Sequence, residues 1–358
     1  MAKKGKFPNI ALENSRHILV IRLSAMGDVA MTVPVLSGLI RQYPNVQITV
    51  LTRGFFAPLF QDLSNVTVYA AEVKGKHKGI IGLYRLFKEL KGLHIDAVAD
   101  LHHVLRSTIL KGYFRLSNIP FVQVDKGRTE KKALTSATNK IFKPLISTHQ
   151  RYADVFNQLG FPVNLELVTP VSQKTLSAIT KNLAGIKAEK WIGIAPNAAF
   201  EGKMYPLKQM YKVVKALNES SKYKILLFGG GQIEEEQLDT WATEFNNCIS
   251  VAGKIPFEEE LTVISHLDLM IAMDSGNAHL ASIYGVPTIT IWGVTHPYAG
   301  FYPFGQDMTN AVLADREQFP LIPTSVYGNK FPKGYENVME TITPEVIIDK
   351  VDSILNRA

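Results

Sequence analysis

Three short stretches place polar or charged side chains where a strand should pass into a helix. The first, Arg22–Leu36 (RLSAMGDVAMTVPVL), follows the apolar run His17–Ile21 and carries Asp28 directly behind Gly27. The glycine allows a tight turn, and a carboxylate is favoured in the first turn of a helix. On these residues alone, the capping role is the simpler interpretation of Asp28. The alternative makes it a general base at the carboxyl edge of a sheet.

The second stretch, Leu267–Gly293 (LDLMIAMDSGNAHLASIYGVPTITIWG), ends a buried-looking strand at Asp274. Ser275 and Gly276 follow, and then a helix that carries His279. A turn of small residues at a helix N-terminus presents backbone N–H groups to a phosphate or diphosphate. An ordinary strand-to-helix turn capped by Asp and Ser is the alternative, because neither Gly-x-Gly-x-x-Gly nor a Walker lysine is present.

The third stretch, Ile194–Pro206 (IAPNAAFEGKMYP), ends a strand and continues as a polar loop with Glu201 and Lys203. A lysine at the carboxyl end of a strand can neutralise a phosphate as a point charge. The alternative is a solvated loop lysine without a ligand.

Weaker signals come from two further strand ends. In the stretch Phe228–Glu236 (FGGGQIEEE), the glycines would let a nucleotide approach the backbone. The alternative is an ordinary acidic helix start that binds no ligand. In Asp100–Ser107 (DLHHVLRS), two adjacent histidines point in different directions on a helix start, which argues against a metal site. Arg106 in that stretch is a candidate anion clamp.

The elements that must position these residues form βαβ units. In the front half, short apolar runs predict strands at Ile18–Leu23, Val46–Thr52, Val66–Ala70, Ala97–Leu101 and Phe121–Val124. Helical patterns lie between them at Val29–Arg41, Ile80–Leu90, Val104–Arg115 and Arg128–Ile141. Such alternation predicts a parallel sheet covered by helices.

The pattern then restarts after Gly160–Pro170, which we interpret as the linker. Strands are predicted at Trp191–Ala195, Lys224–Phe228, Ile249–Val251, Leu269–Met273 and Thr288–Trp292. Helices are predicted at Leu207–Asn218, Ile233–Phe245, Glu258–His266, Asn277–Tyr284 and Pro344–Asn356. We therefore expect two doubly wound α/β domains, whose ligands bind at the carboxyl ends of the strands.

Charge is unevenly spread over the 358 residues, whose net charge is +7. Residues 1–165 hold 23 Lys and Arg and 10 Asp and Glu, a net +13, and the remainder carries −6. A basic front half indicates either an acidic partner or a solvated basic surface. The single cysteine, Cys248, excludes an intramolecular disulfide, and the basic start of the chain lacks the apolar core of a secretory signal. These features predict a cytoplasmic protein.

The three stretches, in their order along the chain, resemble the lipopolysaccharide heptosyltransferase family, glycosyltransferase family 9. The matching residues are RLSAMGDVAMTVPVL, then KMYP at 203–206 where the family usually has Lys-x-Trp-Pro, and DSGNAHLASIYGVPTITIWGVTHP at 274–297. DLHHVLRS is also similar to a family element. Tyr205 departs from the usual tryptophan.

The resemblance implies an α/β GT-B architecture, with two Rossmann-like doubly wound domains facing across a cleft. We expect an acceptor-binding domain over 1–165, a nucleotide-sugar-binding domain over 166–340, and a C-terminal helix over 341–358 that can pack back on the first domain. The implied reaction is inverting, metal-independent heptose transfer from ADP-heptose to the lipopolysaccharide inner core. The implied partners are a phosphorylated lipid A/Kdo acceptor and, peripherally, the cytoplasmic face of the inner membrane, with no cofactor and no nucleic acid.

By matched positions, Asp28 is the expected base, and Lys203 is expected to face the diphosphate. The expected donor-binding residues are Ser24, Gly27, Asn197, Glu201, Gly229, Gly230, Asp274, Ser275, Gly276 and His279. The expected acceptor-binding residues are His102, Arg106, Lys126 and Arg128, and no metal ligands are expected.

Three other functions are compatible with parts of the sequence. One is a nucleotide-sugar enzyme with the same architecture and epimerase-like chemistry, and another is a non-catalytic nucleotide-sugar binder. A nucleic-acid-binding protein would use the basic half, but the sequence lacks a basic stripe interleaved with aromatic residues.

Overall fold

The computed structural model describes residues 16–356 and divides into two compact units. Unit 1 comprises the chain up to Lys126 together with Thr148–Thr169, and unit 2 comprises Gly127–Ser147 together with the chain from Pro170 onward. The basic start of the chain, which was expected not to be a secretory signal, falls in residues 1–15 and lies outside the described residues. Within residues 16–356, no helix has the length and apolar character needed to cross a bilayer.

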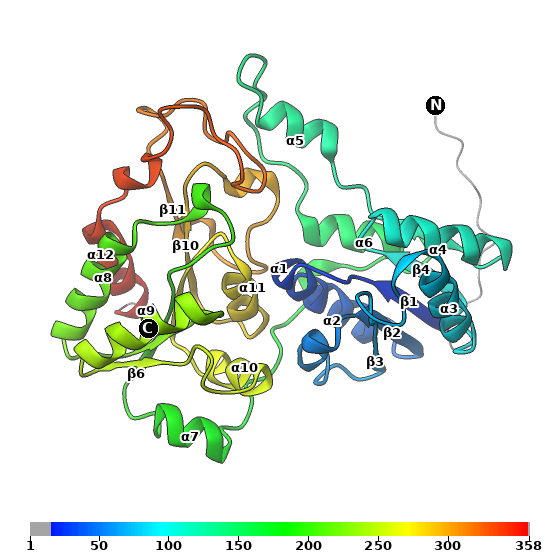
Figure 1. Ribbon diagram of the computed structural model, residues 1–358, viewed down its shortest axis with the longest axis horizontal. Coiled ribbons are helices and arrows are strands. Elements are labelled where there is room, and N and C mark those ends of the chain that lie inside the picture. The colour runs from blue at the N-terminus through cyan, green and yellow to red at the C-terminus, as the bar shows by residue number, and fades with distance from the viewer. Residues whose placement is uncertain (1–15, 357–358) are drawn as a thin grey trace. The chain divides into compact units, whose positions relative to one another are not determined.

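Unit 1 is built on a five-stranded parallel sheet in the order β3-β2-β1-β4-β5 (Figure 1). Its strands are β1 (Arg16–Ile21), β2 (Val46–Thr52), β3 (Val66–Ala70), β4 (Ala97–Asp100) and β5 (Phe121–Gln123). The central strand β1 ends in four buried apolar residues, as expected for a parallel strand covered on both faces. The strand order is that of the Rossmann fold, in which ligands bind beyond the carboxyl ends of the strands.

The helices of unit 1 are α1 (Met26–Ala30), α2 (Thr32–Gln42), α3 (Gly79–Lys91), α4 (Leu105–Leu116) and α6 (Thr148–Gln158). One continuous helix over Val29–Arg41 was expected, but the helix breaks at Met31. Pro34 has no N–H to donate to the carbonyl of Ala30, so α2 starts as a separate helix.

The predicted linker packs on unit 1 through α2. Gln42 exchanges hydrogen bonds with the backbone of Asn164, at 3.0 and 2.9 Å, and the Tyr43 hydroxyl donates to the carbonyl of Pro162 at 3.0 Å. A Cβ on Gly38 would lie 2.7 Å from the side chain of Val168, so this glycine permits the close approach. The chain therefore passes into unit 2 at Pro170.

Unit 2 repeats the Rossmann order with six parallel strands, β11-β10-β9-β6-β7-β8. The strands are β6 (Lys190–Ala195), β7 (Tyr223–Leu227), β8 (Cys248–Ser250), β9 (Leu269–Met273), β10 (Thr288–Trp292) and β11 (Ala311–Leu313). Every residue of β9 and β10 is buried. Two parallel doubly wound sheets confirm the predicted α/β class.

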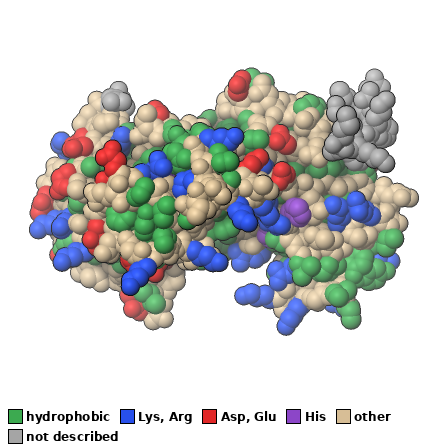
Figure 2. Space-filling model, turned by 90° about the horizontal axis from the view of Figure 1, so that it is seen from above, with side chains coloured by type: hydrophobic (Ala, Val, Ile, Leu, Met, Phe, Trp, Pro, Cys, Tyr) green, Lys and Arg blue, Asp and Glu red, His purple; other side chains and the backbone are tan. Residues whose placement is uncertain are grey.

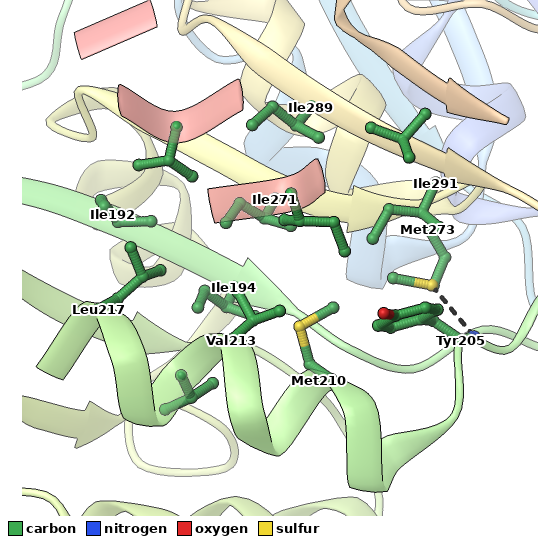
Figure 3. Packing of buried hydrophobic residues seen from close by; sticks show 14 of the residues in the cluster. Ile192, Ile194, Tyr205, Met210, Val213, Leu217, Ile271, Met273, Ile289 and Ile291 are labelled. Atoms are coloured by element: carbon green, nitrogen blue, oxygen red, sulfur yellow. Dashed lines mark hydrogen bonds between the residues drawn. The ribbon is translucent and has the colours of Figure 1, made fainter. Parts of the chain in front are cut away.

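The helices of unit 2 are α5 (Arg128–Leu134), α7 (Ala178–Ala184), α8 (Leu207–Glu219), α9 (Gln232–Glu244), α10 (Phe257–Ser265), α11 (Gly276–Ile283) and α12 (Pro344–Leu355). Figure 3 shows α8 presenting Met210, Val213 and Leu217 to isoleucines of β6, β9 and β10. Tyr205, just before α8, is fully buried, and its hydroxyl donates to the carbonyl of Ile342 at 2.9 Å. The Tyr205 ring is therefore well packed in the core of unit 2.

The C-terminal helix α12 packs on α8 within unit 2. Its residues Ile347, Val351 and Leu355 join the same hydrophobic core as the strands, and Tyr223 of β7 donates to Asp352 at 3.2 Å. This helix therefore completes the core of unit 2, and its expected packing on the first domain stays a prediction.

Helix α5 is shorter than predicted, ending at Leu134 rather than Ile141. The hydroxyl of Thr135 bonds the carbonyl of Lys131 at 3.0 Å, and a run of Thr, Ser and Asn follows that competes with helical hydrogen bonding. Helices α6 and α7 and strand β11 were not predicted, because their apolar patterns are short or irregular.

Candidate active site

Asp28 is the third residue of α1, at the carboxyl end of β1. One carboxylate oxygen, Oδ2, forms an ion pair with the guanidinium of Arg22 and accepts a long hydrogen bond of 3.4 Å from the backbone N–H of Ala25. The side chain remains 29% exposed, and Oδ1 accepts no hydrogen bond from the described residues. The cap contact is therefore real but weak, and it leaves one oxygen open to solvent or to a substrate hydroxyl.

Arg22, which sequence reasoning missed, fixes the orientation of this carboxylate. It is buried, its Nη1 donates to the carbonyl of Leu101 at 2.7 Å, and its Cζ lies 5.9 Å from the centre of the Tyr152 ring. The arginine thus connects the end of β1 to the end of β4. Its place immediately after a buried strand was the available signal.

His102 follows β4, the neighbour of β1 in the sheet. Fully buried Asp100 holds this turn by accepting hydrogen bonds from the backbone N–H groups of His102 and His103, at 3.0 and 2.9 Å. Burial, helped by the positive charges of Arg22 and Lys126, lowers the pKa of His102 to about 4. The imidazole is therefore neutral at pH 7, and its buried Nδ1 has no partner among the described residues.

The other expected acceptor residues fall into both units. Arg106 is exposed in the first turn of α4, and Lys126 lies close enough to His102 to influence it electrostatically, both in unit 1. Arg128 begins α5 and belongs to unit 2. Of the expected donor residues, Ser24 and Gly27 lie in unit 1 beside Asp28.

In unit 2, the carboxyl ends of β6 and β9 bring Lys203 and Asp274 together. The Lys203 Nζ lies 2.7 Å from Oδ2 of Asp274 and donates to the Asp274 carbonyl at 3.1 Å. Both side chains are largely buried, with 15% and 5% exposed. This lysine is therefore a held, partly desolvated cation and not a freely moving loop residue.

Buried polar atoms without partners surround that pair. They are Nδ2 of Asn197, after β6, Oγ of Ser275 and Oδ1 of Asn277, at the start of α11, and Oγ1 of Thr295, after β10; within residues 16–356 none of them has a hydrogen-bond partner. Leaving such atoms unpaired is costly in a folded protein, so each needs an explanation. Since β10, β9 and β6 are adjacent strands, these atoms collect at one edge of the sheet, where a polar ligand would satisfy them.

The start of α11 adds the N–H groups of its first turn, which have no acceptor within the helix. Ser275 is the N-cap residue, but its hydroxyl makes no capping hydrogen bond. Gly276 begins the helix, and His279 is buried one turn later. This N-terminus is suited to an anion such as a diphosphate. Asn277 and Thr295 were not predicted, although both lie inside the family-like motif at 274–297.

The remaining expected donor residues lie around the same edge. Gly229 and Gly230 follow β7, the neighbour of β6, and the N–H of Gly230 donates to the Glu234 carboxylate at 2.9 Å. This backbone N–H group is therefore already hydrogen-bonded to the acidic start of α9. Glu201 is exposed in a short 3-10 turn beside Lys203. Residues 16–356 contain no cluster of three or more His, Cys, Asp or Glu side chains arranged to hold a metal ion.

Two doubly wound units with polar strand ends define a two-domain Rossmann-like enzyme of the GT-B class. The model of glycosyltransferase family 9 (heptosyltransferase) matches residues 83–322, more than half of the chain. The chain therefore belongs to glycosyltransferase family 9 and transfers a sugar from a nucleotide sugar. The match includes Lys203 and Asp274 and begins after Asp28.

Individual relatives agree in length and fold. Lipopolysaccharide heptosyltransferase 1 of Campylobacter coli is 26% identical over 328 residues, covering 84% of this chain and 93% of that protein. A family 9 glycosyltransferase structure from Veillonella parvula has a TM-score of 0.73 at 19% identity, covering 96% of this chain and 98% of that one. E. coli heptosyltransferase WaaC, solved with ADP-2-deoxy-2-fluoro heptose, has a TM-score of 0.65 at 18% identity. The match covers 94% of this chain and 99% of that one. These structures confirm the GT-B fold class.

Proposed function

We propose that this glycosyltransferase moves a heptose from ADP-heptose to the inner core of lipopolysaccharide. The observation that carries the proposal is the edge of unit 2 where Lys203, the N-terminus of α11 and unpartnered buried polar atoms gather. The names of relatives support the sugar and the acceptor, since one is a lipopolysaccharide heptosyltransferase and another was solved with an ADP-heptose analogue.

On the donor side, the diphosphate of ADP-heptose lies at the start of α11. The first-turn N–H groups and the hydroxyl of Ser275 donate to phosphate oxygens, and Lys203 neutralises the charge that grows on ADP as it leaves. Asp274 holds the lysine in place before the donor arrives. Asn197 and Thr295 supply hydrogen bonds to the phosphates or to the sugar.

On the acceptor side, Asp28 removes the proton of the attacking hydroxyl. A bond forms between the acceptor oxygen and the anomeric carbon while the bond from that carbon to the diphosphate oxygen breaks, and the proton passes to the open Oδ1 of Asp28. One displacement inverts the anomeric configuration. Arg22 positions the carboxylate, and His102, Arg106, Lys126 and Arg128 contact anionic groups of a phosphorylated Kdo–lipid A acceptor.

We further propose that the reaction needs no metal ion and takes place at the cytoplasmic face of the inner membrane, where the enzyme is a peripheral protein. Lysine and helix N–H groups provide the charge stabilisation that a divalent cation provides in other sugar transferases.

The experiment offers a panel of nucleotide sugars, including ADP-heptose, ADP-glucose and UDP-N-acetylglucosamine, with lipopolysaccharide truncated at successive core residues. We expect one acceptor to gain the mass of one heptose, with release of ADP. A sugar isomerised on its nucleotide would instead establish epimerase chemistry, and donor binding without any product would establish a non-catalytic binder.

Two further measurements test the finer parts of the mechanism. Turnover should survive exhaustive treatment with a chelator, and NMR of the product should show the anomeric configuration opposite to that of the donor. Activity restored only by added metal would refute metal independence, and a retained configuration would refute a single displacement.

A further inference from the structure

The start of helix α3 in unit 1 exposes large apolar side chains to solvent. Ile80, Ile81 and Tyr84 are 67%, 80% and 49% exposed, although they lie within one and a half turns of the same helix. Together with the exposed Lys74 and Lys78 just before the helix, they form a surface that we call the α3 tip. Single exposed apolar residues are ordinary, but a contiguous group of them indicates an interaction surface.

The charge around the α3 tip is strongly positive. Residues 72–91 contain six Lys and Arg against two Glu, a net +4. Both acids are already engaged, since Glu89 bonds to His77 at 3.0 Å and to the Tyr69 hydroxyl, and Glu72 lies 3.6 Å from Lys76. The exposed cations that have no acidic partner within residues 16–356 are Lys74, Lys78, Arg85, Lys88 and Lys91.

The α3 tip rests on a rigid support. Buried His77 accepts a hydrogen bond at Nδ1 from the backbone N–H of Glu72 at 3.0 Å, and its Nε2 contacts Glu89 on α3. Gly82 packs against the same histidine, since a Cβ there would lie 2.4 Å from the His77 carbonyl carbon. The loop that carries the lysines is thus fastened to the helix that carries the isoleucines, so the surface is formed before any partner binds.

We propose that the α3 tip docks unit 1 onto an anionic phospholipid bilayer, with Ile80 and Ile81 entering the headgroup region and the lysines and arginine contacting lipid phosphates. This mixture of apolar and basic side chains is typical of surfaces that lie in a membrane interface. Figure 2 gives a space-filling view of one face of the molecule, on which hydrophobic side chains and Lys and Arg side chains lie next to one another.

A second copy of the chain is the less favourable occupant of the same surface. In a two-fold symmetric dimer, the α3 tip would face itself and would bring its own positive charges together. An anionic lipid surface instead complements the charge of every cation in the group.

This inference deepens the proposed function, since a lipid-anchored acceptor is met at a bilayer surface, but its test requires neither donor nor acceptor. The full chain is sedimented with vesicles of equal parts phosphatidylglycerol and phosphatidylcholine, and with pure phosphatidylcholine vesicles. We expect binding to the anionic vesicles alone, weakening as salt is raised. Ile80→Ser/Ile81→Ser should lower the partition coefficient at least about tenfold. Lys74→Gln/Lys78→Gln should lower it about 25-fold, about fivefold for each charge.

Matched controls come from unit 2, where Ile186 is 79% exposed and Lys222 and Lys333 are exposed. Ile186→Ser and Lys222→Gln/Lys333→Gln should bind the vesicles as the wild type does, and unchanged thermal unfolding should show that the α3 variants fold. Wild-type binding that survives the α3 substitutions, or no binding to anionic vesicles, would overturn the inference. So would a concentration-dependent dimer abolished by Ile80→Ser/Ile81→Ser, because it would assign the α3 tip to a protein partner.

The same variants separate this inference from the proposed function. Transfer to a deacylated, water-soluble acceptor should be unchanged in Ile80→Ser/Ile81→Ser. If the wild type binds vesicles but transfers no heptose, the proposed function fails and the membrane surface stands.

Discussion

At the scale of single residues, Asp28 shows how one side chain can cap a helix and still be available for chemistry. Its contact with the N–H of Ala25 is 3.4 Å long, so the capping bond is weak, and the Arg22 ion pair sets the orientation. Both contacts use Oδ2, which leaves the second oxygen for a substrate. The competing interpretations of the sequence are therefore compatible.

Asp28→Asn should lower the transfer rate by about 10²- to 10⁴-fold, because an amide can replace the cap but cannot accept the proton. Calorimetry should show unchanged ADP-heptose affinity, since the expected diphosphate site lies in unit 2. The exposed Asp62 of the same unit provides the control, and Asp62→Asn should keep full activity. Near-normal turnover in Asp28→Asn would remove the residue from the mechanism.

Lys203 and Asp274 call for a paired test, because removing the lysine leaves a carboxylate that is only 5% exposed without its partner. Lys203→Ala should raise the KM for donor at least about tenfold and cost about 3 kcal/mol of unfolding free energy. The double variant Lys203→Ala/Asp274→Asn should regain much of the stability and none of the donor affinity. If donor affinity returned with stability, the lysine would act only through folding.

At the scale of elements, two glycines shape the loop that carries Lys203. Gly202 exchanges backbone hydrogen bonds with Gly328 and Val294, accepting from Val294 at 3.0 Å and donating to Gly328 at 3.2 Å. Gly328 has a φ of +78°, and a Cβ there would lie 2.5 Å from Cγ of Lys203. The loop after β6 is thus positioned by a segment more than a hundred residues later.

Gly328→Ala should displace the Lys203 side chain and raise the donor KM about tenfold, with a stability loss above the roughly 1 kcal/mol of a strained backbone alone. Gly334→Ala is the matched control, because Gly334 has a similar φ of +88° but open space around its Cβ position. Steady-state kinetics measures the donor KM of both variants, and urea unfolding measures their stability. Equal donor KM values in both variants would contradict a positioning role for Gly328.

At the scale of the whole molecule, buried titratable groups make the stability of each unit depend on pH. In unit 1, burial lowers the pKa of His102 from 6.5 to about 4, so between those values the unfolded chain binds a proton that the native state does not. The contribution of neutral His102 to the free energy of unfolding is therefore complete above pH 6.5 and is lost as the pH falls towards 4. In unit 2, burial lowers the pKa of His296 to about 4, so this group also reduces the free energy of unfolding as the pH falls. Burial raises the pKa of Glu260 to about 7, so this group instead increases the free energy of unfolding as the pH falls.

Between pH 7 and pH 5, the His102 contribution alone should reduce the free energy of unfolding by about 2 kcal/mol. His102→Gln should therefore lose less stability over this interval than the wild type, by about that amount. Urea unfolding followed by circular dichroism at both pH values measures the difference, and Glu260 and His296 cancel because both proteins contain them. An equal loss in the two proteins would show that His102 is already protonated at pH 5.

The alternation of strands and helices could be predicted because parallel strands buried on both faces are short apolar runs. Every predicted strand was found, and among the described strands only β11 was not predicted. Helix ends were less certain where Pro34 or the Ser- and Thr-rich segment after Leu134 interrupted a pattern. The candidate site could be predicted from the sequence where its residues are neighbours in the chain, as are Asp274, Ser275 and Gly276. Arg22 was missed because its partner Leu101 lies 79 residues away in sequence, and Thr295 was missed because only the burial of its unpartnered hydroxyl marks it.

The sequence by itself therefore determined the α/β class, the two repeats and the local motifs at the strand ends, since each depends on residues within a few positions of one another. Only the tertiary structure decided which motifs meet. Lys203 reaches Asp274 across 71 residues and Arg22 reaches Leu101 across 79, because the sheet order places β6 beside β9 and β1 beside β4. Contacts of that kind follow from the pairing of strands, which no local pattern encodes.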